Sequence, residues 1–286
     1  MAQKPNISTA KFSDGVSWLT GGGNLLARGG PALIRVALVL WLFSMLRWIP
    51  ILGAIALIVI SPALTAGMLN VFRAVGRGEP AQPSLLLAGF HDPSVRKRLL
   101  MLGLFLLIGL SAALAVLVGW LAPQVDADAL NAVLSESEAS AGQAQRLFAV
   151  FQDVNWFGGV VAAALVLAPV LGGLYFSVPL VFFWRWPALT AVIWSFRALL
   201  VNWLAFLGFG LAMFGVLLIA GLVFGLIDQL LNVALGGLGQ MLSQLVSMIL
   251  SLFFQLLIGA AQWLSFVRVF PVDSDELQQA DDSIRG

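Results

Sequence analysis

The apolar residues of this chain are gathered in long segments that polar stretches separate. A helix needs about 20 predominantly apolar residues to cross the hydrocarbon core of a bilayer. The pattern predicts about six such helices, which we place at residues 32–46, 51–75, 99–121, 156–184, 201–227 and 240–270. The expected fold is therefore an all-α integral membrane bundle.

The first apolar segment, residues 31–75, is too long for a single crossing. Pro50 disfavours a helical conformation at Ile49, and Arg47 and Trp48 are residue types that favour a membrane interface. We therefore expect the chain to turn at this point and to return as a second helix.

Two shorter apolar stretches, residues 83–90 and 188–200, each follow a proline and cannot span a bilayer. We expect both to form interfacial helices on the cytoplasmic face. The helix over residues 156–184 contains two prolines and should be kinked. The glycine-containing segment 228–239 is expected to be a connection, and the sequence leaves open whether it re-enters the membrane.

The polar segments predict the remaining parts of the chain. Residues 1–30 lack the apolar core of a signal peptide and should form a cytoplasmic tail. The alternative is that the short first helix begins earlier than Ala32, at Asn24 or Leu25. The acidic segment 122–155 has two weak amphipathic stripes, joined by a flexible stretch over 135–143. The acidic end, residues 271–286, has too few apolar residues to pack and is expected to be disordered.

Orientation follows from the basic residues, which are enriched in cytoplasmic loops. All of the 15 Lys and Arg residues except Arg47 and Arg146 fall on the side of the 76–98 and 185–200 loops. The acidic 122–155 segment falls on the opposite side. The expected localisation is a bacterial inner membrane, with several crossings, both termini in the cytoplasm and the acidic segment in the periplasm.

The two halves of the chain also show a repeated order of features. Pro62 and Pro80 have counterparts 107 residues later, in Pro169 and Pro187. In each half a proline-bearing helix enters the cytoplasm, an interfacial helix follows, and another helix returns. This order indicates a parallel internal repeat. The alternative is that two apolar helical hairpins align through their composition alone.

Composition narrows the function classes. Hydrophobic residues make up 60% of the chain and charged residues only 10%, against about 25% charged in a soluble domain. The net charge of +1 gives no field that attracts nucleic acid. Cysteine is absent and His91 is the single histidine, so the common catalytic and metal-binding constellations are missing. We expect no enzyme activity, no metal and no cofactor.

A cluster of charged residues is expected at the cytoplasmic ends of the second and third helices. It contains Arg73, Arg77, Glu79, Arg96, Lys97 and Arg98. These residues either form a basic pocket for anionic lipid or an acidic partner segment, or serve only to set the topology. Glu79 would then pair locally with Arg77 or Arg98.

The last helix carries a polar stripe at spacings of three, four and seven residues, which places its members on one face. The stripe consists of Gln240, Gln244, Ser247, Ser251, Gln255 and Gln262. Polar side chains face lipid only at a cost. The stripe therefore faces other helices or a second copy of the chain, a solute path, or a groove for lipid headgroups. Asn202, at the start of the fifth helix, should cap that helix or bond across the bundle.

Ionisable residues are expected only near helix ends, as with Arg35, Arg185, Arg197 and Asp228. Energised transporters usually carry a buried acid or base within a span. This placement therefore argues against ion-coupled transport.

The stretch from Ser61-Pro62 through Phe72-Arg73 and Arg77-Gly78-Glu79-Pro80 to Phe90 resembles an uncharacterised proteobacterial family of BPSS-type membrane proteins. More loosely, it is similar to the YciC-type membrane proteins. Residues 194–203 match the second half of the same family. The resemblance implies a polytopic inner-membrane protein and no established activity or catalytic residues.

Two functions follow from these observations. The first is a non-enzymatic inner-membrane scaffold or accessory protein that packs with lipids, other membrane proteins or a second copy of itself. The alternative is a passive or weakly coupled transporter or lipid-handling protein that uses the polar stripe and the proline-kinked helix.

Overall fold

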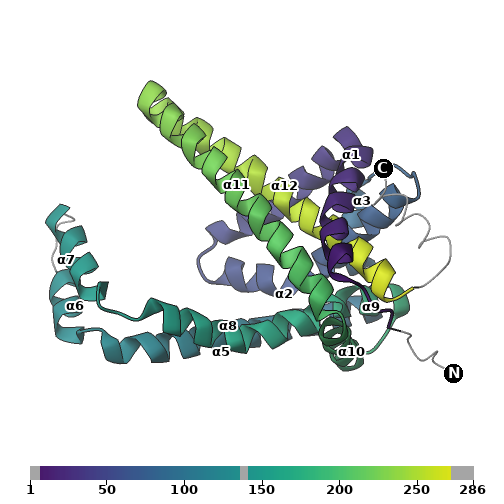
Figure 1. The fold of residues 1–286 in the computed structure, drawn as a ribbon, viewed down its shortest axis with the longest axis horizontal. Helices are drawn as coiled ribbons and strands as arrows, with labels where there is room; N and C mark the ends of the chain where they lie inside the picture. The colour runs from purple at the N-terminus through teal and green to yellow at the C-terminus, as the bar shows by residue number, and fades with distance from the viewer. Residues whose placement is uncertain (1–6, 136–140, 272–286) are drawn as a thin grey trace. The chain divides into compact units, whose positions relative to one another are not determined.

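The computed structural model describes residues 7–135 and 141–271, and these residues are almost entirely helical (Figure 1). The expected disordered tail lies outside the described residues, apart from Pro271. The helices are α1 (Phe12–Ser44), η1 (Met45–Trp48), α2 (Leu52–Gly76), α3 (Pro83–Leu86), α4 (Ala88–His91), α5 (Pro93–Leu121), η2 (Ala122–Gln124), α6 (Ala127–Leu134), α7 (Ala141–Phe151), α8 (Trp156–Tyr175), α9 (Ser177–Trp184), α10 (Ala188–Val201), α11 (Trp203–Leu235) and α12 (Gly237–Val269).

Six spans within the described residues are long and apolar enough to cross a membrane. The all-α multi-pass class expected from the sequence is therefore confirmed. The chain divides into two compact units, Met1–Gly103 with Gly173–Gly286, and Leu104–Gly172. The first unit contains α1 to α4, the start of α5, and α9 to α12. The second contains most of α5 and α8, together with α6 and α7.

The N-terminal prediction was wrong, because residues 12–30 are the first half of a long helix and not a tail. α1 begins at Phe12 and runs to Ser44, with a kink at Gly30. The sequence suggested a tail because glycines and polar residues interrupt its hydropathy. Arg28 and Arg35 consequently lie inside a helix, contrary to the expectation that ionisable residues occupy helix ends.

The glycines of this segment allow α1 to lie against α11 and α12. A Cβ on Gly15 would be 1.8 Å from the carbonyl oxygen of Ala205 in α11. A Cβ on Gly22 would be 3.2 Å from the backbone nitrogen of Ala261 in α12. Trp18, on the same face, is fully buried and meets the ring of Phe206 edge to face at 5.5 Å. Close helix contact therefore supplies the stability that the segment's composition lacks.

α11 and α12 form a long antiparallel hairpin (Figure 1). The expected connection over residues 228–239 is helical except for a tight turn at Gly236, where φ is +55°. Only glycine adopts this backbone conformation readily. Gly239 packs closely on the carbonyl of Leu231. Asp228 lies eight residues before the turn and is therefore also inside a helix.

The kinked fourth span is two helices, α8 and α9, which meet at Phe176. Pro179 has no N–H to donate to the carbonyl of Tyr175, four residues earlier, and its ring crowds that carbonyl. The helix therefore breaks within this turn. The N–H of Phe176 donates to the hydroxyl of Ser195 in α10, at 2.8 Å. The expected kink is confirmed, and the break lies next to Pro179 rather than at Pro169.

The two short helical regions occur where they were expected. α10 matches the predicted segment within one residue. Residues 83–91 instead form two single-turn helices, α3 and α4, interrupted at Leu87. Both lie against α2, where the Cβ position of Gly67 is 1.8 Å from the carbonyl of Leu86. This contact with α2 fixes α3 tightly.

The second unit is built on the pairing of α5 with α8. The Cβ position of Gly109 is 2.6 Å from a methyl group of Val170, and Gly159 faces Trp120 and Leu117. The expected amphipathic stripes become α6 and α7, except that Val154 lies beyond the end of α7. Part of the expected flexible stretch, residues 136–140, lies outside the described residues.

A polar groove along α12

The polar stripe of α12 has two environments. It is buried near the C-terminal end of the helix and open nearer to the hairpin turn. Gln262 is only 7% exposed. Gln244, Ser247, Ser251 and Gln255, nearer to the hairpin turn, are all exposed within the first unit. The two parts therefore have different physical roles.

Gln262 satisfies a backbone carbonyl at the break between α8 and α9. Its Nε2 donates to the carbonyl oxygen of Tyr175 at 2.6 Å. This is the carbonyl that Pro179 leaves without its usual helical donor. The hydroxyl of Ser265, one turn further along α12, hydrogen-bonds with the hydroxyl of Tyr175 at 3.1 Å. This end of the stripe is a packing contact, which is one of the alternatives expected from the sequence.

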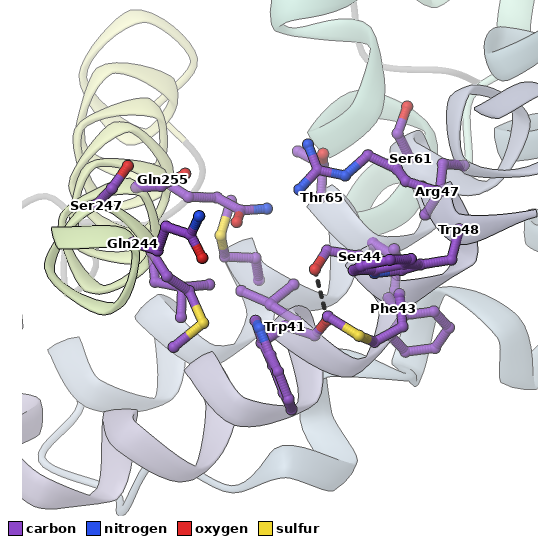
Figure 2. A pocket seen from close by; sticks show the side chains of 18 residues that line it. Trp41, Phe43, Ser44, Arg47, Trp48, Ser61, Thr65, Gln244, Ser247 and Gln255 are labelled. Carbon is purple, nitrogen blue, oxygen red and sulfur yellow. Dashed lines mark hydrogen bonds between the residues drawn. The ribbon is translucent and has the colours of Figure 1, made fainter. Parts of the chain in front are cut away.

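The other four residues line a groove of about 550 Å³ between α12, the end of α1, η1 and α2. Figure 2 shows Gln244, Ser247 and Gln255 on α12 along one side, with Ser44 and Thr65 on the opposite side. Polar side chains therefore face each other across an open space between three of the candidate membrane spans. Gln240 is exposed and lies outside this groove.

The hydroxyl groups of the opposite wall are fixed by their own helices. The hydroxyl of Ser61 donates to the carbonyl oxygen of Ile58 at 2.8 Å, the carbonyl that Pro62 leaves unpaired. The hydroxyl of Ser44 donates to the carbonyl oxygen of Trp41 at 2.6 Å. Because each hydroxyl has used its single proton, it offers only acceptor lone pairs to the groove. The side-chain amides of Gln244 and Gln255 and the guanidinium of Arg47 are among the donors that line the groove.

Arg47 is the charged residue among those that line the groove. Figure 2 shows its side chain reaching into the space beside Thr65, with Gln255 on the other side. Trp41 and Trp48 line the same end. Within residues 7–135 and 141–271, Arg47 has no carboxylate partner. The groove therefore combines a positive charge, amide donors and hydroxyl acceptors, and its charge favours an anionic group.

A second polar cluster, near the hairpin turn, was not expected. The hydroxyl of Ser243 and the side-chain amide of Asn232 both donate to Oδ1 of Asp228, the latter at 3.0 Å. The three residues join α11 to α12. Asp228 was expected in a connection between helices, and this contact was therefore not predicted. Helical spacing from Asp228 to Asn232 is the signal that indicates it.

Three of the charged residues expected at this end, Arg73, Arg96 and Arg98, have contacts within the described residues. The guanidinium of Arg73 lies over the ring of Phe183 at 5.2 Å. Arg96 donates to the carbonyl of Phe90 at 3.3 Å, and Arg98 donates to the carbonyl of Arg185. The other three members, Arg77, Glu79 and Lys97, are exposed.

Arg98 and Arg185 connect the segment around the start of α5 with the segment that follows α9. Arg185 forms an ion pair with Asp92 at 2.5 Å. Hydrogen bonds from the hydroxyl and the N–H of Ser94 lower the pKa of Asp92 to about 2, so this carboxylate is charged at neutral pH. The conformation of Arg185 is left-handed, with φ of +58°, and it ends α9.

Asn202 does not cap α11 with its side chain. It is 1% exposed, its Oδ1 accepts from the N–H of Ala10 at 2.6 Å, and its Nδ2 donates to the carbonyl of Ala198 at 2.9 Å. Of the two expectations for this residue, bonding across the bundle is the one that the structure contains. Pro187 is the N-cap residue of α10, whereas Pro80 is an exposed residue in the turn after α2.

Comparisons of the chain with protein-family models, with curated proteins and with solved structures give no match. The resemblance to BPSS-type and YciC-type membrane proteins therefore rests on the motifs of the sequence alone. Fold and groove together define the class of this protein as an all-α multi-pass membrane protein with a polar groove among its spans.

Proposed function

We propose that this chain is a non-enzymatic, lipid-handling membrane protein that holds the polar part of an amphiphile in the groove along α12. The observation that carries this proposal is the open polar stripe facing Ser44, Ser61 and Thr65. In a bilayer, polar side chains require partners that hydrocarbon does not supply. A lipid headgroup, with bound water, supplies them.

The scaffold role expected first from the sequence requires the stripe to close against other helices. Gln262 is closed in this way, but the four residues of the groove are not. A groove of about 550 Å³ is within the usual range for small-molecule sites. These observations favour the alternative of a lipid-handling protein over a scaffold. The proposed function is binding alone, without the making or breaking of covalent bonds.

Ser251→Phe separates the two functions. In an open groove the ring has room, so we expect the free energy of unfolding to fall by less than about 1 kcal/mol. Phospholipid retained after purification in mild detergent should fall several-fold, because the ring occupies the groove. Detergent thermal unfolding and mass spectrometry of retained lipid measure the two effects.

Leu245→Phe is the matched control, since Leu245 is 52% exposed on α12 and lies outside the groove. This variant should keep both its stability and its lipid. If Ser251→Phe instead costs more than about 2 kcal/mol, the stripe is a packing seam and the scaffold function is the correct one.

We further propose that the protein lies in a bacterial inner membrane with both termini in the cytoplasm. Support comes from the basic residues at the ends of α2, α5 and α12 and from the acidic segment around α6. Arg28 and Arg35 no longer contribute, since they lie within α1.

Single cysteines test this orientation in a chain that has none of its own. A cysteine replacing Asp128 in α6 should react with an impermeant thiol reagent added to intact spheroplasts. A cysteine replacing Ser84 in α3 should react only after the membrane is opened. Both residues are exposed, so the comparison reports sidedness and not burial. The reverse labelling pattern would show that the orientation is inverted.

A further inference from the structure

A second groove lies beside the polar one and is apolar. It has a volume of about 680 Å³ and is bounded by α1 and α12. Gly23, Leu33, Ala37 and Leu38 line it from α1, and Ile249 and Leu252 line it from α12. Met248 and Leu252 line both grooves. The two spaces are therefore neighbours that share side chains as a common wall, and methionine is a flexible side chain that can move aside.

The sequence of α1 explains why space is left at this place. The backbone of Gly30 has φ of +49° and ψ of −143°, and Pro31 follows it, so the helix kinks there. The apolar groove extends along α1 on both sides of this kink, from Gly23 to Leu38. Gly23 contributes no side chain, and nothing lies within 4 Å of the position that its Cβ would take.

The dimensions of the apolar groove suit a hydrocarbon chain. Gly23 and Leu38 are 15 helical steps apart, about 22 Å along α1, against a hydrocarbon core of about 30 Å. In the expected topology Arg47 and Trp48 lie at the membrane interface, and the apolar groove extends from that end toward the middle of the bilayer. A lipid in the same leaflet has the same direction, with its headgroup at the interface and its chain inward.

The charge of Arg47, at the interfacial end of the grooves, indicates that the bound headgroup is anionic. Arg47 reaches into the polar groove, and no acidic residue lines either groove. A cation with few protein partners at a membrane interface favours an anion. The planar guanidinium matches phosphate oxygens, which it binds with two parallel hydrogen bonds.

We propose that the two grooves are one binding site for an anionic amphiphile, with a phosphate on Arg47 in the polar groove and an acyl chain in the apolar groove along α1. This inference deepens the proposed function, because it names the chemistry of the headgroup and the place of the chain. The glutamine amides and the hydroxyls of α12 then contact the part of the headgroup next to the phosphate.

Three probes separate the contributions of charge and chain. Lysophosphatidic acid with a 16-carbon chain has both, monoacylglycerol of the same length has only the chain, and glycerol 3-phosphate has only the phosphate. Binding to the purified full-length protein is measured in detergent by thermal shift and by native mass spectrometry. We expect lysophosphatidic acid to bind at least about tenfold more tightly than monoacylglycerol, which lacks the charge-assisted contact of the phosphate. The same minimum is expected against glycerol 3-phosphate, which lacks the apolar surface of the acyl chain.

Arg47→Gln tests the phosphate contact. It should reduce the affinity for lysophosphatidic acid about tenfold and leave the affinity for monoacylglycerol unchanged. Arg268→Gln is the matched control, because Arg268 is exposed in the last turn of α12 and lies outside both grooves. It should change neither affinity.

Gly23→Leu tests the place of the chain. The new side chain meets no backbone and enters the apolar groove, so folding should be preserved while the affinity for both acyl probes falls at least about tenfold. Gly215→Leu is the control, since Gly215 of α11 also has nothing within 4 Å of its Cβ position and lines neither groove. Thermal unfolding without lipid confirms that each variant is folded.

The outcomes distinguish this inference from the proposed function. If Ser251→Phe lowers retained lipid but Arg47→Gln and Gly23→Leu bind lysophosphatidic acid as the parent does, the two-groove site is wrong and the lipid-handling function stands. Glycerol 3-phosphate binding as tightly as the lipid would also overturn the two-groove site, in favour of a soluble phosphate ligand. If the parent binds none of the probes and Ser251→Phe retains its lipid, both proposals fail.

Discussion

Gly15→Leu should destabilise the first unit by about 3 kcal/mol or more, the largest effect expected of any substitution described here. A Cβ at this position would be 1.8 Å from the carbonyl oxygen of Ala205 and 2.7 Å from the backbone nitrogen of Phe209. Both are backbone atoms of α11, so no side-chain rotation relieves the overlap. The two helices must separate, and the buried contact between Trp18 and Phe206 is lost with them.

Gly23→Leu provides the comparison within the same helix. It places the same side chain where nothing lies within 4 Å, and leucine is about 0.8 kcal/mol better than glycine in a helix interior. Thermal unfolding in detergent should therefore show a large fall for the substitution at residue 15 and none for that at residue 23. A similar fall at both positions would mean that α1 tolerates no side-chain addition, and that its close contact with α11 is not the cause.

Gln262→Leu and Gln255→Leu should differ in the same assay although the chemical change is identical. Gln262 donates to the carbonyl of Tyr175, which Pro179 leaves without its helical donor. Its loss leaves a buried acceptor unpaired, at a cost of about 1–2 kcal/mol. Gln255 is exposed in the groove and makes no hydrogen bond within the described residues, so its replacement should cost less than about 0.5 kcal/mol.

The lipid content of the two glutamine variants should show the opposite order. Gln255→Leu should reduce retained phospholipid because it removes a donor from the groove, and Gln262→Leu should keep its lipid as long as it is folded. Equal stability of the two variants would contradict the division of the stripe into a packed part and an open part.

Sequence patterns were sufficient to predict the helices that appear in the sequence as long apolar segments. The six spans, the short apolar helix α10 and the break in the fourth span all follow from apolar length and from the positions of prolines. These features depend on the solvent and on the local backbone, which a single sequence contains.

The N-terminal half of α1 and the tip of the hairpin were not predicted, for a different reason. Residues 12–30 are helical because their glycines let α1 approach two other helices. Glycine alone favours a loop or tail in sequence-based reasoning. Only tertiary contacts reverse that preference. The composition of residues 12–30 does not indicate that α11 and α12 lie against them.

The candidate site was predicted in part. Helical spacing correctly placed the six polar residues of α12 on one face, but it did not indicate that one would bind a carbonyl freed by Pro179 while four would line a groove. Arg47 was assigned to the interface from its position beside Trp48. Its place in the groove follows from the path of the chain through η1, which spacing along one helix does not describe.

The hairpin of α11 and α12 also places a condition on the bilayer itself. Each helix has 33 residues, a length of about 50 Å, whereas the hydrocarbon core measures about 30 Å. Even at a tilt of about 40°, the upper end of the common range, the pair extends about 38 Å along the membrane normal, so at least one of its ends reaches the headgroup layer. A thinner bilayer increases this hydrophobic mismatch and forces more tilt. Because α12 is a wall of both grooves, a tilt of α12 relative to α1 and α2 would change the width of both.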